Sequence, residues 1–228
     1  MKHNYSDALL ADQPELWQKA INHPFAVALA QGNLPDEAFR EYVIQDTIFC
    51  HSVRKMIGLL VTKLPDRTEG IWEKIEDDIS KEVPPGPEMN TLRSYRKELN
   101  IKDEEFKDVN LVTKGFGDFL VALAYQGSYK EILVALLEIL FVYEAWAEKF
   151  AESNPGDAKV QKWIDVHRDR VQGPDISLIR SALDEARKEG KHIKPNRKHK
   201  EILKHTLMWE IAFWDSICNP NKYQWKTK

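Results

Sequence analysis

The stretch SYKEILVALLEILFVYEAWAEKF, residues 128–150, decides the fold of this chain. It opens with the pattern of a capping box, because Ser128 and Glu131 can each accept a hydrogen bond from the backbone N–H group of the other. A run from Ile132 to Val142 follows that is apolar on every face of a helix. We therefore expect this helix to lie inside the protein, with other helices packed around it.

Glu138 stands in the middle of this apolar run. Burying an isolated carboxylate is costly, so such a group must be paired, protonated or put to use. For a single acidic residue in an apolar helix, a structural role such as a cap or an ion pair is the more common explanation. Glu138 differs because its helix offers no polar face. We therefore interpret it as a functional residue.

The composition is that of an ordinary globular protein. Of the 228 residues, 43% are hydrophobic and 30% are charged, which argues against disorder and predicts one domain over residues 1–228, with a polar tail at 222–228. A formal net charge of −3 gives no electrostatic case for a nucleic-acid partner. The longest apolar run is too short to cross a bilayer, so we expect no membrane partner. Two cysteines and the lack of a signal-peptide pattern predict a cytoplasmic protein.

Helix signals recur from one end of the chain to the other, and no segment alternates strictly between apolar and polar residues. Proline favours the first turn of a helix and glycine the position after its last turn. Gly32 is thus expected just after one helix and Pro35 at the start of the next. The main predicted helices span residues 35–64, 67–83, 88–99, 109–126, 128–152, 155–171, 176–189 and 195–218. They predict an all-α domain of roughly ten helices.

Two further acidic residues stand in apolar helical settings, Asp46 in YVIQDTIF and Glu210 in LMWEIAFW. Asp46 follows Tyr42 and Val43 by one helical turn, so it points to the inward face of its helix. Together with Glu138, these residues predict a pocket between helices that is lined by aromatic side chains. Carboxyl groups of raised pKa would act there as acid and base.

Metal and nucleophile chemistry are less favoured. Di-metal helical bundles use Glu-x-x-His pairs on facing helices, and none of the seven histidines follows a glutamate at that spacing within an apolar helix. We therefore expect neither a catalytic metal nor a cofactor. Cys50 lies one helical turn after Asp46 and can share its pocket, but a buried cysteine is usually inert.

Three motifs resemble one known family. Residues 23–46, HPFAVALAQGNLPDEAFREYVIQD, resemble the N-terminal signature of the TenA/THI-4 family. Residues 127–146, GSYKEILVALLEILFVYEAW, resemble its central helix, and residues 207–217, LMWEIAFWDSI, its closing motif. The motifs keep the family's order over nearly the whole chain. The resemblance implies a heme-oxygenase-like bundle of α-helices, commonly a homotetramer, and hydrolysis of thiamin or of its aminopyrimidine breakdown products in thiamin salvage.

By this resemblance, Asp46 binds the ring nitrogen and amino group of an aminopyrimidine, Glu210 moves protons, and Phe213 packs against the ring. A carboxylate suits the first role, because the two ring groups are adjacent donors. Glu138 stands where the usual form of the family has a nucleophilic cysteine. This departure implies the branch associated with hydrolysis of amino- or formylamino-pyrimidines. A glutamate is a reasonable general base for water, so we expect Glu138 as base and Glu210 as partner acid.

The aromatic positions also depart from the family pattern. Phe49 and Phe116 stand where tyrosines are common, and Val142 and His167 replace further ones. Phenylalanine keeps the stacking surface without the hydroxyl group, and valine loses both. His167 can supply an acid or base near neutral pH, with a supporting structural role equally open. Tyr143 completes the expected binding residues, and the changes leave the substrate and leaving group open.

The expected function is a metal-free hydrolase that acts on an aminomethyl- or formylaminomethyl-pyrimidine, and that assembles as a homotetramer or dimer. Two alternatives stay open. One is another small-heterocycle enzyme on the same fold, such as the oxidase and di-iron oxygenase relatives, although the histidine pattern argues against the di-iron form. The other is a non-catalytic pyrimidine-binding or regulatory protein, although no basic recognition helix supports direct contact with DNA.

Overall fold

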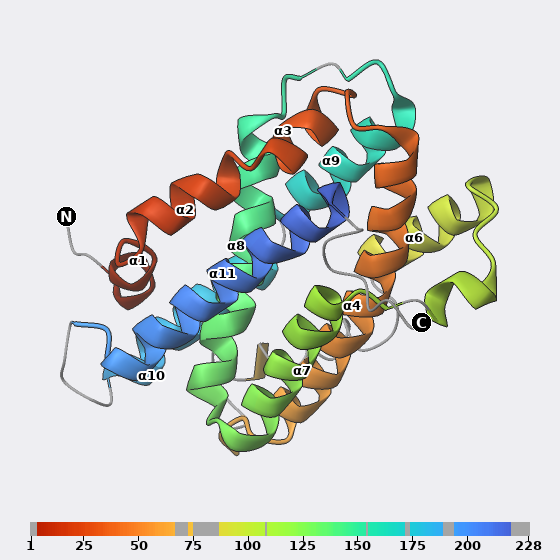
Figure 1. Cartoon of the computed structure of the whole chain (residues 1–228). Helices are drawn as coiled ribbons and strands as arrows, with labels where there is room; N and C mark the ends of the chain where they lie inside the picture. The colour runs from red at the N-terminus through yellow and green to blue at the C-terminus, as the bar shows by residue number, and fades with distance from the viewer. Residues whose placement is uncertain are drawn as a thin grey trace.

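The computed structural model describes residues 4–66, 73–74, 87–107, 109–153, 155–171, 174–188 and 194–219. Within these residues the chain is helical, with turns and one 3-10 helix, and no residue there forms a strand (Figure 1). The all-α prediction is confirmed. The helices with described bounds are α1 (Tyr5–Leu10), α2 (Pro14–Ile21), α3 (Pro24–Ala30), α4 (Asp36–Val61), α6 (Pro87–Glu98), η1 (Asp103–Lys107), α7 (Leu111–Gln126), α8 (Tyr129–Lys149), α9 (Ala158–Val171), α10 (Pro174–Lys188) and α11 (Arg197–Cys218).

Most observed helix boundaries lie within a few residues of the predicted ones, and the differences have local causes. α4 begins one residue late because Pro35 is its N-cap, and the Pro35 carbonyl accepts from the Phe39 N–H group at 2.9 Å. α7 begins at Leu111 rather than at residue 109, since the Asn110 side chain caps it by accepting from the backbone of Val112 at 2.8 Å. The predicted helix at 67–83 and the tail at 222–228 lie largely outside the described residues.

Two predicted end signals are confirmed. The carboxylate of Glu131 accepts a hydrogen bond from the backbone N–H of Ser128 at 3.0 Å, so it satisfies a donor at the start of α8. Gly32 follows the last turn of α3 with a left-handed φ of 68°. A side chain there would also meet the backbone oxygen of Pro155 at 2.1 Å, so glycine is required twice over.

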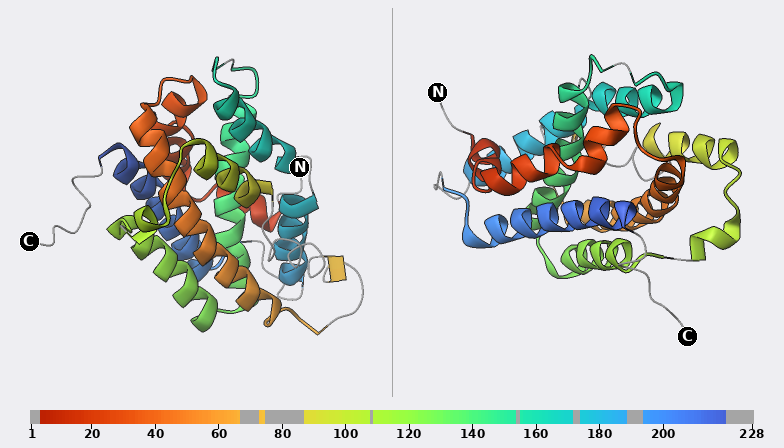
Figure 2. Two further views of the ribbon diagram at one scale, coloured as in Figure 1. Left: turned by 90° about the vertical axis from the view of Figure 1, so that its right-hand side faces the viewer. Right: turned by 45° about the horizontal axis from the view of Figure 1, so that its top comes forward.

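α8 is the helix around which the others are arranged. Every residue from Ile132 to Ile139 is buried, so α8 has no face toward solvent over this length. It contacts α2, α4, α7, α9, α10 and α11. Figure 1 shows α8 passing behind α11, and in the left view of Figure 2 α4, α7 and α8 run side by side. The prediction of a buried central helix is confirmed. None of the described helices is both long and apolar enough to cross a membrane.

α4 and α7 approach each other closely because α7 carries a glycine where they meet. A Cβ atom on Gly117 would lie 2.5 Å from the Oγ atom and 3.0 Å from the Cβ atom of Ser52 on α4. The same packing brings Phe49 of α4 against Phe116 of α7, with ring centroids 4.5 Å apart. Gly117 therefore sets the distance between the helix that carries Asp46 and its neighbour.

We expect a Gly117→Ala substitution to lower the free energy of unfolding by about 1–3 kcal/mol, because the added methyl group overpacks against Ser52. Urea unfolding followed by circular dichroism measures the change. Gly58→Ala in α4 is the matched control, since a Cβ there meets nothing within 4 Å and should raise stability by about 0.5–1 kcal/mol. Unchanged stability in Gly117→Ala would show that the two helices tolerate a wider spacing.

Candidate active site

Helices α4, α6, α8 and α9 enclose a cavity of about 40 Å³. On α4 and on α8 the lining residues recur at intervals of three or four, so they lie along one face of each helix. The buried floor consists of Asp46, Phe49, Ile139, Tyr143 and His167, and the partly exposed mouth consists of Cys50, Val53, Glu88, Leu140 and Glu144. Apolar walls with a few convergent polar groups are typical of a small-molecule site.

The predicted site residues fall into two groups. Asp46, Phe49, Tyr143 and His167 line the cavity. The others are buried without lining it, namely Phe116, Glu138, Val142, Glu210 and Phe213. Phe116 and Phe213 lie beside Phe49, at ring-centroid distances of 4.5 and 5.8 Å, so they back the aromatic wall of the cavity.

Glu138 and Glu210 form a buried pair of carboxyl groups. Glu138 is 0% exposed and Glu210 1% exposed. Burial raises the pKa of Glu138 well above its usual range, and the charge of Glu210 raises it further. Burial raises the pKa of Glu210 to about 8. Neither oxygen of Glu138 has a hydrogen-bond partner in the described part of the chain. The prediction of carboxyl groups with raised pKa is confirmed for both.

Tyr143 connects this pair with the cavity. Its hydroxyl group is close enough to Glu210 to lower the pKa of that carboxyl, although no described group meets full hydrogen-bond geometry with either Glu210 oxygen. The Tyr143 oxygen also lies 3.4 Å from the hydroxyl of Tyr42, which accepts from Nε1 of Trp163 at 3.2 Å. Burial raises the pKa of Tyr42 and of Tyr143 well above the usual range, so both phenols keep their protons at neutral pH. Tyr143 thus lines the cavity, and Glu210, which does not line it, lies next to the Tyr143 hydroxyl group.

His167 has a defined orientation on the cavity floor. Its Nδ1 atom lies 2.8 Å from the backbone oxygen of Trp163, and a carbonyl can only accept, so Nδ1 carries a proton. The ring stacks on Tyr143 with centroids 4.7 Å apart and planes 24° apart. Nε2 has no hydrogen-bond partner among the described residues and lies 3.7 Å from Oε1 of Glu88. His167 therefore presents Nε2 to the cavity.

Two carboxyl groups at the mouth were not predicted as site residues. Glu88 is the second residue of α6, where an acidic residue is usual for a helix start, and nothing near it in sequence marks a pocket. Glu144 lies directly after Tyr143 on α8, at the partly exposed side of the cavity. Burial raises the pKa of Glu144, the charge of Glu148 raises it further, and Arg180 lowers it. Glu88 joins the cavity because α6 packs against α4 and α9, and Glu144 joins it from α8.

Asp46, Cys50 and Glu88 are close enough to share a cation, because one ligand atom of each lies within 4.8 Å of those of the other two. Asp46 and Cys50 are one turn apart on α4, as their spacing predicted, and both line the cavity. The Sγ atom of Cys50 lies 3.8 Å from Oε1 of Glu88. Two carboxylates and a thiol form a mixed set of donors that the sequence did not indicate, since Glu88 is remote from the other two residues.

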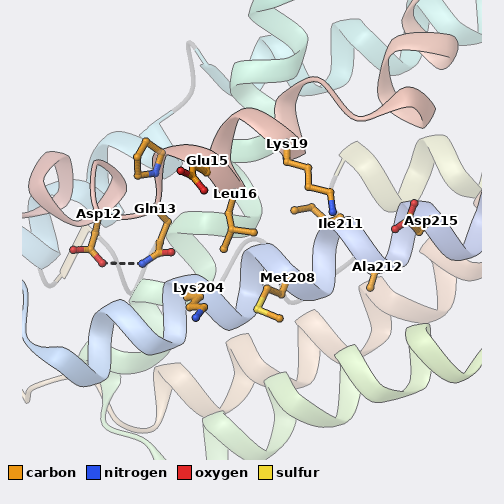
Figure 3. Close-up of a pocket in the computed structure, with 11 residues that line it drawn as sticks. Asp12, Gln13, Glu15, Leu16, Lys19, Lys204, Met208, Ile211, Ala212 and Asp215 are labelled. Atoms are coloured by element: carbon orange, nitrogen blue, oxygen red, sulfur yellow. Dashed lines mark hydrogen bonds between the residues drawn. The ribbon is translucent and has the colours of Figure 1, made fainter.

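Figure 3 shows a second and larger depression, a groove of about 610 Å³ between α2 and α11. It contains none of the predicted site residues, and none of its titratable residues is fully buried. Two of its carboxylates are already paired, Asp12 with Lys200 and Asp215 with His23. This groove is a charged surface feature, and the cavity between α4, α6, α8 and α9 is the candidate active site.

The fold and the cavity together define a helical protein with an internal, carboxyl-lined site for a small molecule. Residues 11–220 match the TENA/THI-4/PQQC family. Because this match covers most of the chain, the protein belongs to that family, and the resemblance carried by the three sequence motifs is confirmed.

Proteins similar to this chain agree with the assignment. The aminopyrimidine aminohydrolase of Helicobacter pylori is 26% identical over 218 residues, which cover 92% of this chain and 96% of that protein. The aminopyrimidine aminohydrolase of Bacillus subtilis (strain 168) is 25% identical over 221 residues, covering 92% and 88%. The structure of a TenA homologue from P. horikoshii OT3 is 25% identical, covers 94% of this chain and 98% of its own, and superposes with a TM-score of 0.79. The expected heme-oxygenase-like fold is confirmed.

A Glu138→Leu substitution should raise the free energy of unfolding by about 1–3 kcal/mol, because it replaces a buried carboxyl group that lacks partners by an apolar side chain. Thermal and urea unfolding measure the gain. The same substitution at Glu131 is the control, because that carboxylate caps α8 and pairs with Lys198 at 2.9 Å, so its loss should destabilise the protein. A less stable Glu138→Leu variant would show that partners do compensate for burying the carboxyl group of Glu138.

The raised pKa of Glu210 predicts a pH-dependent stability. Between the ordinary pKa of glutamate and about 8, the folded state holds a proton on Glu210 that the unfolded state has lost. The free energy of unfolding therefore falls as pH rises through this window. Glu210→Gln removes this contribution, so its stability relative to the unmodified protein should increase from pH 5 to pH 8. Urea unfolding at unit steps of pH tests this, and parallel pH profiles for the two proteins would refute it.

Proposed function

We propose that this protein hydrolyses an aminopyrimidine derived from thiamin breakdown, with an aminomethyl or formylaminomethyl group as the site of attack. Membership of the family and the names of the two similar aminohydrolases support the reaction class. The observation that carries the proposal is the surroundings of Tyr143. This side chain lines the cavity together with Asp46, whose carboxylate can bind the substrate, and its hydroxyl group is next to Glu210, whose charge acts on Glu138.

In this proposal Asp46 binds the pyrimidine from the floor of the cavity. The ring amino group and the protonated ring nitrogen are adjacent donors, and a carboxylate can accept from both. Phe49 and Tyr143 provide the aromatic walls, supported by Phe116, Val142 and Phe213 behind them. A cavity of about 40 Å³ is smaller than ligand pockets usually are, so entry of the ring requires the partly exposed side chains at the mouth to move aside.

The reaction forms a carbon–oxygen bond to water and breaks a carbon–nitrogen bond. On an aminomethyl substrate, water attacks the methylene carbon as ammonia leaves, and on a formylaminomethyl substrate it attacks the formyl carbon, which yields formate and the amine. In both cases the attacking water loses a proton and the leaving nitrogen finally gains one. These are proton transfers and a substitution, so the scheme calls for no redox cofactor.

The pKa pattern favours a division of labour within the carboxyl pair. Burial raises the pKa of Glu138 well above its usual range, and the charge of Glu210 raises it further, so in this scheme Glu138 holds a proton and can donate a hydrogen bond. Burial raises the pKa of Glu210 to about 8, and its charge in turn raises the pKa of Glu138, so Glu210 is the residue of the pair that ionises first and can serve as the proton acceptor next to Tyr143. This assignment exchanges the roles expected from the sequence, which placed the base at the position of the family's cysteine.

The proposal also covers the setting of the enzyme. We place it in the cytoplasm, and we expect it to assemble with copies of itself as a homotetramer or dimer, as the resemblance to the family implies. In this scheme His167 is the acid or base at the leaving nitrogen, because its Nε2 atom faces the cavity from the floor.

The purified protein should release ammonia from an aminomethyl-pyrimidine or formate from its formylamino derivative. Glu210→Gln and Glu138→Gln should each lower kcat by about 100-fold or more, because general acid–base catalysis supplies that much. Asp46→Asn should mainly raise KM. The exposed residue Glu37 serves as control, since Glu37→Gln lies outside the cavity and should leave both constants unchanged. Turnover of neither substrate would reject the proposed function, and full activity of both glutamine variants would reject the assigned roles.

A further inference from the structure

Four buried side chains from four helices form a chain of polar groups that ends at Glu210. Trp163 on α9, Tyr42 on α4, Tyr143 on α8 and Glu210 on α11 are at most 8% exposed. Nε1 of Trp163 lies 3.2 Å from the hydroxyl oxygen of Tyr42, which lies 3.4 Å from that of Tyr143. Burial raises the pKa of Glu210, and the Tyr143 hydroxyl beside it lowers that pKa. Each of the four helices thus contributes one member of this chain.

The hydrogen bonds of the chain have a defined direction. An indole N–H group can only donate, so the Tyr42 oxygen accepts from Trp163. Burial raises the pKa of Tyr42 and of Tyr143, so each hydroxyl group still holds one proton at neutral pH. In the described part of the protein, the other hydrogen-bond partner of the Tyr42 oxygen is the Tyr143 hydroxyl. The Tyr42 proton therefore goes to Tyr143, which keeps its own proton for Glu210.

Ring packing keeps the two hydroxyl groups in place. The Tyr143 ring stacks on His167, with centroids 4.7 Å apart, and meets the ring of Trp214 nearly at a right angle, with centroids 5.8 Å apart. The Tyr42 ring meets the ring of Trp163 at an angle of 80°, also at 5.8 Å. Neither phenol can swing away from the chain without losing these contacts. The positions of the oxygen atoms are thus set by packing, and the direction of the protons is set by Trp163.

An oriented chain of this kind favours charge at its accepting end. A hydroxyl group that accepts a hydrogen bond becomes a stronger donor, and the effect is larger in a buried, low-dielectric setting. Tyr42 therefore strengthens the bond that Tyr143 can donate to an ionised Glu210. At 3.4 Å the bond between the two phenols is near the upper limit of hydrogen-bond length, so we expect Tyr42 to contribute less than Tyr143 itself. Neither Tyr42 nor Trp163 lines the cavity.

We propose that Tyr42 is a positioning residue for the proton acceptor: held by the indole N–H of Trp163, it directs the Tyr143 hydroxyl proton to Glu210 and so stabilises the carboxylate form of that residue. This inference rests on the proposed function, in which Glu210 accepts the proton of the attacking water. Tyr42 acts through Tyr143 and does not touch the substrate. All protons of the two phenols stay where they are during the reaction, since only the direction of their hydrogen bonds matters.

The first test measures the ionisation of Glu210 without turnover. Urea unfolding from pH 5 to pH 9.5 compares each protein with its own Glu210→Gln partner. The difference in stability falls as pH rises and levels off once Glu210 ionises in the folded state, near pH 8 in the unmodified protein. Tyr42→Phe should move this levelling-off upward by about 0.5–1 pH unit, a threefold to tenfold change in ionisation. Trp163→Phe should move it in the same direction.

A double substitution shows whether Tyr42 acts through Tyr143. Tyr143→Phe should cause a larger upward shift, and adding Tyr42→Phe to it should cause no further shift. Tyr95→Phe is the matched control, because Tyr95 is also 1% exposed but donates its hydroxyl proton to the backbone oxygen of Lys159 at 2.6 Å. It should leave the ionisation of Glu210 unchanged. No shift in Tyr42→Phe, or an equal shift with and without the Tyr143 hydroxyl, overturns the proposal.

A kinetic test connects the chain with catalysis. Relative to the unmodified protein, kcat of Tyr42→Phe at pH 7 should fall about threefold to tenfold and recover as pH rises, because more Glu210 then ionises. KM should change little, since Tyr42 does not line the cavity. An equal loss of kcat at every pH from 7 to 9.5 overturns the proposal and assigns Tyr42 a purely structural role. Turnover of neither pyrimidine would reject the proposed function, while the unfolding comparison would still decide the role of Tyr42.

Discussion

The structure depends on one costly interaction, the burial of two carboxyl groups against each other inside an all-α core. Glu138 lies on the helix that the other helices surround, and Glu210 lies on α11, which packs across it. Burial disfavours both charges, so the protein holds protons on these groups at a pH where free glutamate has lost them. The apolar packing around α8 is what keeps this arrangement folded, and the proton chemistry of the site is a consequence of that packing.

The sequence predicted the buried half of the site well, because burial leaves a periodic signal. Asp46 and Glu138 stood out as acidic residues in apolar helical patterns, and the same patterns placed α4 and α8 correctly. The sequence did not predict Glu88, since an acidic residue at a helix start looks like an ordinary helix-stabilising charge. Nor did it predict that Glu138 and Glu210 would lie behind the cavity wall, because periodicity gives the face of a helix and not the depth of a side chain.

Resemblance to a family added roles but also carried over an assumption about them. Aligning Glu138 with a nucleophilic cysteine made it the expected base, whereas we propose Glu210 for that role. Burial raises the pKa of both carboxyl groups, the Tyr143 hydroxyl lowers that of Glu210, and the charge of Glu210 raises that of Glu138 further. His167 illustrates the opposite case. The backbone oxygen of Trp163 fixes which ring nitrogen faces the cavity, and no pattern of side chains in the sequence encodes that contact.

The mouth of the cavity is built partly from the same helices as its floor, and this sharing has an evolutionary consequence. α4 and α8 carry residues of both the floor and the mouth, and among the described lining residues α6 contributes Glu88. Substitutions at the start of α6 can therefore change which ligands are admitted without disturbing the buried carboxyl pair. A lineage built on this scaffold can thus vary Glu88 without altering a helix that carries the buried carboxyl pair, whereas the rest of α6 is less free to change, because Leu92 and Tyr95 are buried in the core.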